Sequence, residues 1–129
     1  MSIDLLTETE TEKVSVLVVD DSADQRMLLR RHFEKAGCVV DIAATAEEAF
    51  AAFNARQPEL MVIDLVLPGM DGWELAKVMR SDHPELPIAI TSVLRPDRYP
   101  DADASLPKPF SGASVRKVLG QCVPRWAVA

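Results

Sequence analysis

The chain has 129 residues, of which 48% are hydrophobic, 26% charged and 5% aromatic, a composition typical of one soluble globular domain. No apolar run approaches the roughly 18 residues of a membrane span, and the N-terminus lacks the basic and apolar regions of a secretory signal. Cys38 and Cys122 are too few for a disulfide framework, so we expect a cytoplasmic domain with idle thiols and no membrane partner.

The net charge of −6 at pH 7 is unevenly distributed along the chain. Residues 1–12 contain four acids and no base, whereas the remainder carries 14 basic against 16 acidic residues. This nearly neutral remainder offers no basic face for nucleic acid. We expect an acidic, disordered lead-in at 1–12, one domain at 13–122 and a C-terminal tail at 123–129. Partner binding by the lead-in stays open as an alternative.

The first half of the chain alternates strand and helix patterns. Residues 14–19 form an apolar run that is too continuous for a half-exposed strand and therefore predicts a buried parallel one. A helix begins at Ser22 and ends at a glycine, and a second strand follows at 38–43. A second helix begins at Thr45 and ends before a proline, and the third strand covers 60–63.

The same alternation continues in the second half. Proline and glycine indicate a loop at 65–70, after which Asp71 can cap a third helix. Strands are predicted at 88–90 and 104–106, and Ser111 begins the last helix. The pattern as a whole predicts an α/β fold with a doubly wound parallel sheet of five strands.

One crossover is too short for a full helix. Only residues 92–103 separate the fourth and fifth strands, and they include Pro96 and Pro100. Prolines four residues apart leave room for a single turn at most. The fourth helix is therefore expected to be missing or reduced to a turn or loop.

Polar residues stand at the carboxyl ends of four predicted strands, where parallel sheets bind ligands. They are Asp20, Asp21, Asp64, Thr91 and Lys108. Crowded carboxylates favour a bound cation, and oxygen ligands without Cys or His select Mg²⁺. The hydroxyl and the ammonium remain to hold phosphoryl oxygens, and one carboxylate can act as a nucleophile. Each residue alone could be a helix cap or loop residue, but together they predict a site.

Four motifs in this order resemble the receiver domain of two-component response regulators. The motifs are Val18-Val19-Asp20-Asp21-Ser22, the run from Asp64 to Gly72, Thr91-Ser92 and Lys108-Pro109-Phe110. The resemblance covers residues 14 to about 122. It implies a flavodoxin-like sheet with strand order 2-1-3-4-5, and a signalling switch rather than a turnover enzyme.

The resemblance also implies roles for the polar residues. Asp64 would be the phosphoacceptor, taking its phosphoryl group from a histidine kinase or a histidine phosphotransfer protein. Thr91 and Lys108 would bind phosphoryl oxygens, and the Lys108–Pro109 peptide bond would be cis, as is typical of the family. The implied Mg²⁺ ligands are Asp21, Asp64 and the backbone carbonyl of Val66, with Asp20 reaching the ion through water.

In receivers the first helix and the loop after the fifth strand usually contact the phosphodonor. The matching residues here are Ser22, Asp24, Gln25, Leu28, Pro109 and Phe110. Leu28 is either an exposed anchor or an ordinary core residue. Trp73 is expected to pack. For Trp126 a frayed end is favoured over a homodimer contact.

The sequence favours a stand-alone receiver that switches an unknown downstream protein or relays phosphate, and three other functions compete with this interpretation. A receiver-like interaction module that works without phosphorylation is favoured by the short crossover and by Ser105, where receivers usually carry an aromatic switch residue. A Mg²⁺ phosphatase would need an acid where Val66 stands. A flavin-binding domain would need a phosphate loop rich in Ser, Thr or Gly after the first strand.

Overall fold

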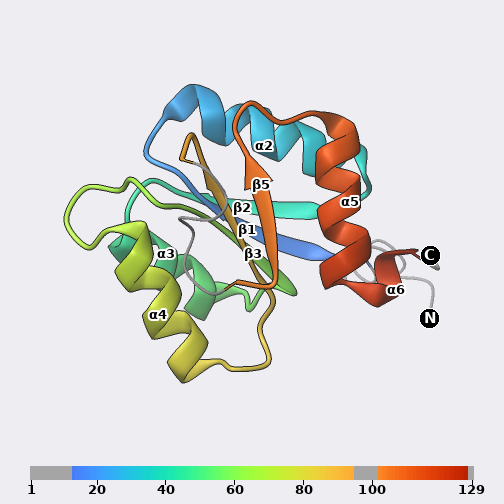
Figure 1. Ribbon diagram of the computed structural model, residues 1–129. Coiled ribbons are helices and arrows are strands. Elements are labelled where there is room, and N and C mark those ends of the chain that lie inside the picture. The colour runs from blue at the N-terminus through green and yellow to red at the C-terminus, as the bar shows by residue number, and fades with distance from the viewer. Residues whose placement is uncertain (1–12, 95–101, 128–129) are drawn as a thin grey trace.

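A computed structural model describes residues 13–94 and 102–127 (Figure 1). Five parallel strands form one sheet in the order β2-β1-β3-β4-β5. The strands are β1 (Ser15–Val19), β2 (Val39–Ala43), β3 (Leu60–Asp64), β4 (Ile88–Ser92) and β5 (Ala104–Pro107). The predicted fold class and strand order are confirmed.

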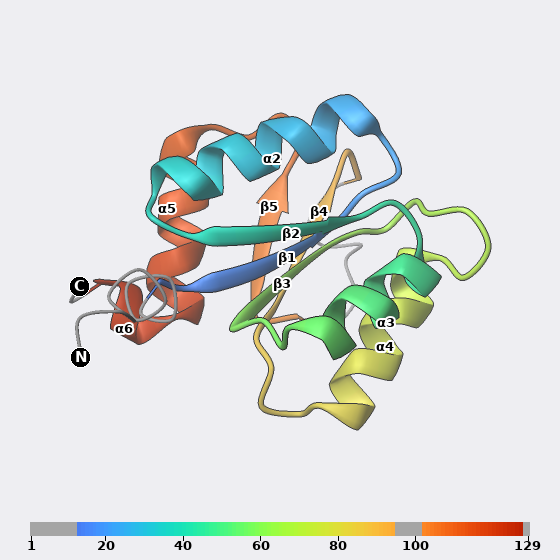
Figure 2. The same ribbon diagram turned by 180° about the vertical axis from the view of Figure 1, so that it is seen from behind.

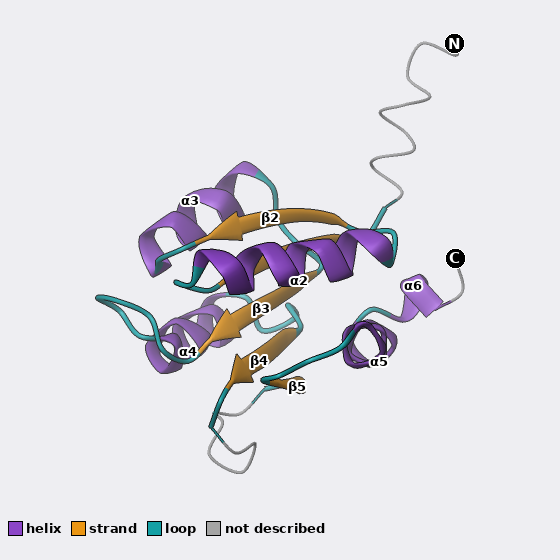
Figure 3. Ribbon diagram, turned by 90° about the horizontal axis from the view of Figure 1, so that it is seen from above, coloured by secondary structure: helices purple, strands orange, loops and turns teal. Residues whose placement is uncertain are grey.

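Helices cover both faces of this sheet. They are α2 (Ala23–Lys35), α3 (Ala46–Ala55), α4 (Gly72–Asp82), α5 (Gly112–Cys122) and α6 (Pro124–Ala127). Helices α2 and α5 lie on one face, and α3 and α4 lie on the other (Figures 1 and 2). Phe33 and Leu119 belong to the first core, and Phe53 and Met79 to the second. In the view from above, α2 lies in front of the sheet (Figure 3). Because helices cover both faces, the central strands are apolar on both sides.

The predicted caps begin the four longer helices. Each cap has an extended backbone, and its side-chain oxygen accepts the backbone N–H three residues further on. These residues are Ser22, Thr45, Asp71 and Ser111, with oxygen-to-nitrogen distances of 3.3, 3.1, 2.9 and 3.2 Å. A side chain that satisfies an orphan N–H fixes the first turn, and in α2 and α4 this first turn borders the acidic edge of the sheet.

Parts of the sequence prediction fall outside the described residues. The lead-in at 1–12 does, and so does most of the expected short crossover, because the description omits 95–101. The flanking residues 93–94 and 102–103 are not helical. No helix in the described ranges has the length and apolarity needed to cross a bilayer.

The C-terminal residues 123–127 are folded, which corrects the frayed end expected for Trp126. The Trp126 Nε1–H donates to the carbonyl oxygen of Ala36 at 2.8 Å, and the ring packs against the first core. The Arg125 guanidinium donates to both carboxylate oxygens of Glu59 at 2.6 Å. A tryptophan N–H that finds a buried partner allows the rest of the ring to cover apolar surface, so α6 belongs to the domain.

The two cysteines are free and buried. Burial raises the pKa of the Cys38 and Cys122 thiols to about 11. Both therefore stay protonated at neutral pH, and protonated thiols are poor nucleophiles and metal ligands. This matches the expectation of idle thiols.

Candidate functional site

The register of the sheet brings the predicted site residues to one edge. Val19 pairs with Ile63, so Asp20 and Asp21 leave β1 beside the end of β3. Asp64, the last residue of β3, pairs with Thr91. Lys108 follows β5, and its backbone N–H donates to the carbonyl of Ser92 at 2.9 Å. Thr91 lies within β4 rather than after it, because β4 extends to Ser92.

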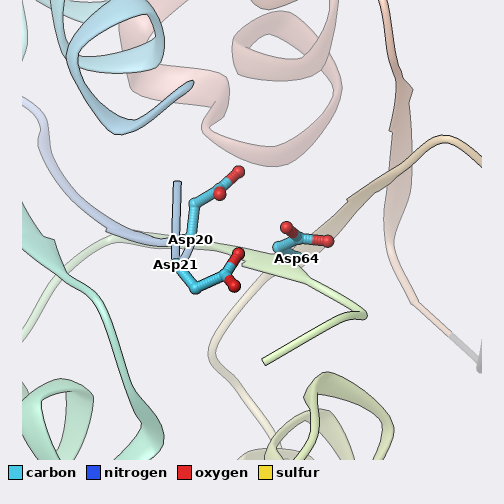
Figure 4. A group of neighbouring side chains, drawn as sticks. All are labelled: Asp20, Asp21 and Asp64. Carbon is cyan, nitrogen blue, oxygen red and sulfur yellow. The ribbon is translucent and has the colours of Figure 1, made fainter. Parts of the chain in front are cut away.

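Three carboxylates form a cluster at this edge (Figure 4). Asp20, Asp21 and Asp64 each offer one oxygen, and these oxygens lie within 4.8 Å of one another. Adjacent ligands around an octahedral Mg²⁺, with bonds of about 2.1 Å, lie about 3 Å apart. Asp20 and Asp64 are buried whereas Asp21 is exposed. The cluster therefore fits a small hard cation that keeps water on its exposed side.

Lys108 contacts two of the three acids. Its Nζ lies 3.0 Å from Asp20 Oδ2 and donates to Asp64 Oδ2 at 3.1 Å. Burial alone would lower the pKa of the Lys108 ammonium, but its interactions with Asp20 and Asp64 outweigh burial and raise that pKa. Lys108 is therefore a fixed positive charge at the site. The Lys108–Pro109 bond is cis, as predicted.

Asp64 is held from two sides. Its Oδ1 accepts the Val66 N–H at 3.1 Å, and its Oδ2 accepts Lys108. Burial and the charge of Asp20 raise the pKa of Asp64, although Val66 and Lys108 oppose this shift. Ionised Asp64 therefore depends on nearby positive charge. The role predicted for the Val66 carbonyl stays a prediction.

Thr91 carries a buried hydroxyl that forms no hydrogen bond within the described part of the chain. The residue is 0% exposed, and its Oγ1 has no hydrogen-bond partner among the residues that the structure describes. As the register partner of Asp64 it extends its side chain from the same face of the sheet. Leaving a buried hydroxyl unpaired costs about 1–3 kcal/mol. Such an atom next to a buried carboxylate indicates that a polar group completes the site.

Gly72 shapes the site, a role that the sequence prediction missed. Its N–H donates to the Leu65 carbonyl at 3.0 Å. A Cβ at this position would overlap the backbone carbonyl oxygen of Asp64 and lie 2.5 Å from the Cα of Leu65. Only glycine therefore lets α4 begin so close to the end of β3. The available signals were its place directly after the predicted cap, Asp71, and its place at the end of the motif that runs from Asp64 to Gly72.

The residues predicted to contact the phosphodonor are all exposed or half-buried in the described part of the chain. Leu28 is 37% exposed, so it is not an ordinary core residue, and its role as an anchor stays a prediction. Asp24 and Pro109 are also exposed, and Ser22, Gln25 and Phe110 are half-buried. Phe110 meets the His32 ring edge-on, with 6.0 Å between the ring centroids. Trp73 is 39% exposed, which corrects the expectation that it packs.

A hollow of about 710 Å³ lies away from the acid cluster. Its lining includes Pro58, Glu59, Pro87 and Arg125. Pro58, Glu59 and Pro87 precede β3 and β4, so the hollow borders the amino ends of these strands. The acid cluster lies at their carboxyl ends. The candidate site is therefore defined by its side chains and not by a large cavity.

A parallel sheet with this strand order, with acids, a threonine and a lysine at its carboxyl edge, defines the class of doubly wound α/β domains that bind at a strand switch point. The chain belongs to the response regulator receiver domain family, whose model matches residues 16–119. The sequence resemblance is thereby confirmed.

Individual relatives agree with this family. A 14.6 kDa protein of Leptolyngbya boryana is 37% identical over 106 residues, which cover 77% of this chain and 76% of that protein. The DNA-binding transcriptional regulator NtrC of Proteus hauseri is 31% identical over 110 residues, or 77% of this chain. This chain spans only 22% of that NtrC and 49% of a probable transcriptional regulator ycf27 of Porphyridium aerugineum.

Solved structures give the same result. The receiver domain of NtrX from Brucella abortus superposes with a TM-score of 0.75 at 31% identity, covering 84% of this chain and 98% of that one. The chemotaxis response regulator CheY4 of Vibrio cholerae gives a TM-score of 0.78 at 28% identity, covering 86% and 99%.

Proposed function

We propose that the chain accepts a phosphoryl group on Asp64 in a Mg²⁺-dependent reaction. The donor is the phosphohistidine of a histidine kinase or histidine phosphotransfer protein, and the product switches the binding of a downstream protein or passes the phosphoryl group onward. In this proposal the chain is a signalling switch in the cytoplasm and not a turnover enzyme. Its free, buried thiols suit a reducing compartment.

One observation carries this proposal. The unsatisfied hydroxyl of Thr91 and the ammonium of Lys108 stand beside the same buried carboxylate, Asp64. Together they supply one neutral and one charged donor for the oxygens of a phosphoryl group attached there. A purely structural cluster would gain nothing from a buried hydroxyl without a partner.

The chemistry follows from these positions. An Asp64 carboxylate oxygen attacks phosphorus, the phosphorus–nitrogen bond of the phosphohistidine breaks, and its electrons return to the imidazole of the donor. Negative charge on the three equatorial oxygens is balanced by Lys108 and by the Thr91 hydroxyl. Mg²⁺, when held by Asp20, Asp21 and Asp64, supplies further neutralisation of this charge. The Val66 N–H is a further donor for a phosphoryl oxygen in this proposal; it now donates to Asp64 Oδ1 at 3.1 Å and would exchange that oxygen for the phosphoryl group.

Acetyl phosphate tests the proposal without any partner protein. We expect the wild-type chain incubated with acetyl phosphate and Mg²⁺ to gain one phosphoryl group by intact-mass spectrometry, and the adduct to be absent when EDTA replaces Mg²⁺. A chain that binds partners independently of phosphorylation would stay unmodified under both conditions. An adduct that forms equally well in EDTA would contradict the role given to the acid cluster.

Recognition of the phosphodonor should depend on the exposed face of α2. We expect Asp24→Lys or Leu28→Ala to slow phosphotransfer by about tenfold, because an exposed apolar anchor and its neighbouring charge contribute on the order of 1–2 kcal/mol at such contacts. The donor is any histidine kinase or phosphotransfer protein that labels the wild-type chain, and the rate is read from the phosphorylated fraction over time.

Met27→Ala is the matched control for Leu28→Ala. Met27 is 50% exposed and adjacent to Leu28, but it points about 100° away around the helix. It should leave phosphotransfer unchanged. Asp24→Lys and Leu28→Ala should both keep the wild-type rate of labelling by acetyl phosphate. Equal losses with the two donors would show that α2 affects the acid cluster and is not a docking surface.

A further inference from the structure

Arg26 extends from the first turn of α2 to the end of β1, where Asp20 and Asp21 of the acid cluster lie. Its guanidinium donates to the backbone carbonyl oxygen of Asp20 at 2.8 Å. Arg26 is half-buried, and its own N–H donates to the Ser22 carbonyl at 2.9 Å. The residue is therefore anchored in α2 while its head group contacts the end of β1.

Three polar groups of Asp20 form hydrogen bonds, and the fourth, the buried Oδ2, has only an ion-pair contact with Lys108. Its N–H donates to the Ala43 carbonyl at 3.0 Å, and its Oδ1 accepts the Ser22 N–H at 2.9 Å. Its Oδ2 faces Lys108, and its carbonyl oxygen accepts Arg26. These contacts come from the start of α2, the end of β2 and the residue after β5, so Asp20 is held from several sides.

Asp21 is held differently. Its side chain is exposed, and within the described ranges no hydrogen bond or ion pair to that side chain is formed. Its position is thus set through its backbone. The carbonyl that Arg26 holds belongs to the Asp20–Asp21 peptide, and this peptide is planar. Fixing that carbonyl therefore also fixes the direction of the Asp21 N–H and Cα.

We propose that Arg26 is a positioning residue that holds the Asp20–Asp21 peptide in the orientation required for Asp21 to act as a cation ligand. This inference rests on the proposed function, since the cation is part of it. Arg26 contacts a ligand residue and not the ion, as do the outer residues that orient ligands in other metal sites. Removing such a residue weakens metal binding by about 10–100-fold.

The sign of the effect separates positioning from simple electrostatics. Arg26 is a positive charge near three carboxylates, so on charge alone its removal would make Mg²⁺ bind more tightly. If it positions Asp21, its removal makes Mg²⁺ bind more weakly. The two accounts predict opposite changes in the same dissociation constant.

The experiment compares Mg²⁺ titrations of three variants with the wild type. Arg26→Met keeps the aliphatic stem and removes the donor. Arg26→Lys keeps the charge and one donor. Arg30→Met is the matched control, because Arg30 is one turn further along α2, pairs with Glu34 at the surface at 3.2 Å and carries the same charge. The melting temperature is followed against Mg²⁺ concentration, which reports binding without phosphorylation.

We expect Arg26→Met to raise the Mg²⁺ dissociation constant about 10–100-fold, Arg26→Lys to raise it less, and Arg30→Met to leave it unchanged. Saturating Mg²⁺ should then restore most of the acetyl phosphate labelling rate of Arg26→Met, since the phosphoacceptor itself is intact. Should Arg26→Met be unfolded in EDTA, Arg26→Lys carries the same comparison.

Two results would overturn the inference, and they are distinguishable. If the wild type binds Mg²⁺ and Arg26→Met binds it equally or more tightly, only the role of Arg26 is wrong. If the wild type itself shows no stabilisation by Mg²⁺, the proposed function fails and the inference fails with it. In the first case, a lower melting temperature of Arg26→Met at unchanged Mg²⁺ affinity would assign Arg26 to fold stability alone.

Discussion

Asp64→Asn should abolish labelling by acetyl phosphate, with a loss of at least about 100-fold, because the amide has no anionic oxygen to attack phosphorus. The substitution is nearly isosteric, so Lys108 and the Val66 N–H, which contact Asp64 at 3.1 Å, keep a side chain of the same shape beside them. The readout is the mass of the intact chain over time, in the presence of Mg²⁺.

Asp71→Asn provides the control for this loss. Asp71 is exposed in the loop after β3 and caps α4 through the Glu74 N–H at 2.9 Å. Asparagine caps a helix about as well as aspartate, so this variant makes the same chemical exchange without touching the site. It should be labelled at the wild-type rate. Phosphoryl incorporation into Asp64→Asn would place the acceptor on another residue.

Gly72→Ala should destabilise the protein by about 3 kcal/mol, the upper part of the range for overpacking a rigid site. The added methyl group would meet backbone atoms of Asp64 and Leu65, which cannot rotate away as a side chain could. Either α4 moves outward or the end of β3 shifts, and both displace the proposed phosphoacceptor. We therefore expect slower labelling together with the loss of unfolding free energy, measured by urea denaturation.

Gly120→Ala makes the same chemical change with the opposite expected sign. Gly120 lies in α5, is exposed, and has no heavy atom within 4 Å of an added Cβ. Replacing glycine by alanine within a helix stabilises by about 0.5–1 kcal/mol. Similar unfolding free energies for the two variants would contradict the close approach described at Gly72.

The fold could be predicted because its signals are local. Apolar runs mark four of the strands, although not the short β5, and the starts of four helices are marked by Ser22, Thr45, Asp71 and Ser111 through contacts three residues away. Parallel topology then brings the carboxyl ends of the strands together. The position of the acid cluster follows from this topology, since no other arrangement of Asp20 and Asp64 satisfies the register of β1 and β3.

Contacts between distant segments could not be predicted in this way. Trp126 and Ala36 are 90 residues apart in the chain, and Arg125 and Glu59 are 66 apart. A short segment after a proline carries no periodicity that would indicate α6. The roles of Gly72 and Arg26 were hidden for a related reason, because both depend on how closely a helix start approaches a strand end. Leu28 was ambiguous because helical spacing alone does not separate a core edge from an exposed one.

The docking of α6 determines where the molecule can be tethered. Arg125 and Trp126 fix α6 beside Glu59 and Ala36, at the amino edge of the sheet where β1 also begins. A five-residue strand spans roughly 16 Å, so this edge and the acid cluster face away from each other. A capture tag or fluorophore joined after α6 or before β1 would leave the acid cluster and α2 accessible. Immobilised chains should therefore bind Mg²⁺ and phosphodonor as free chains do, which permits surface-based kinetics of both.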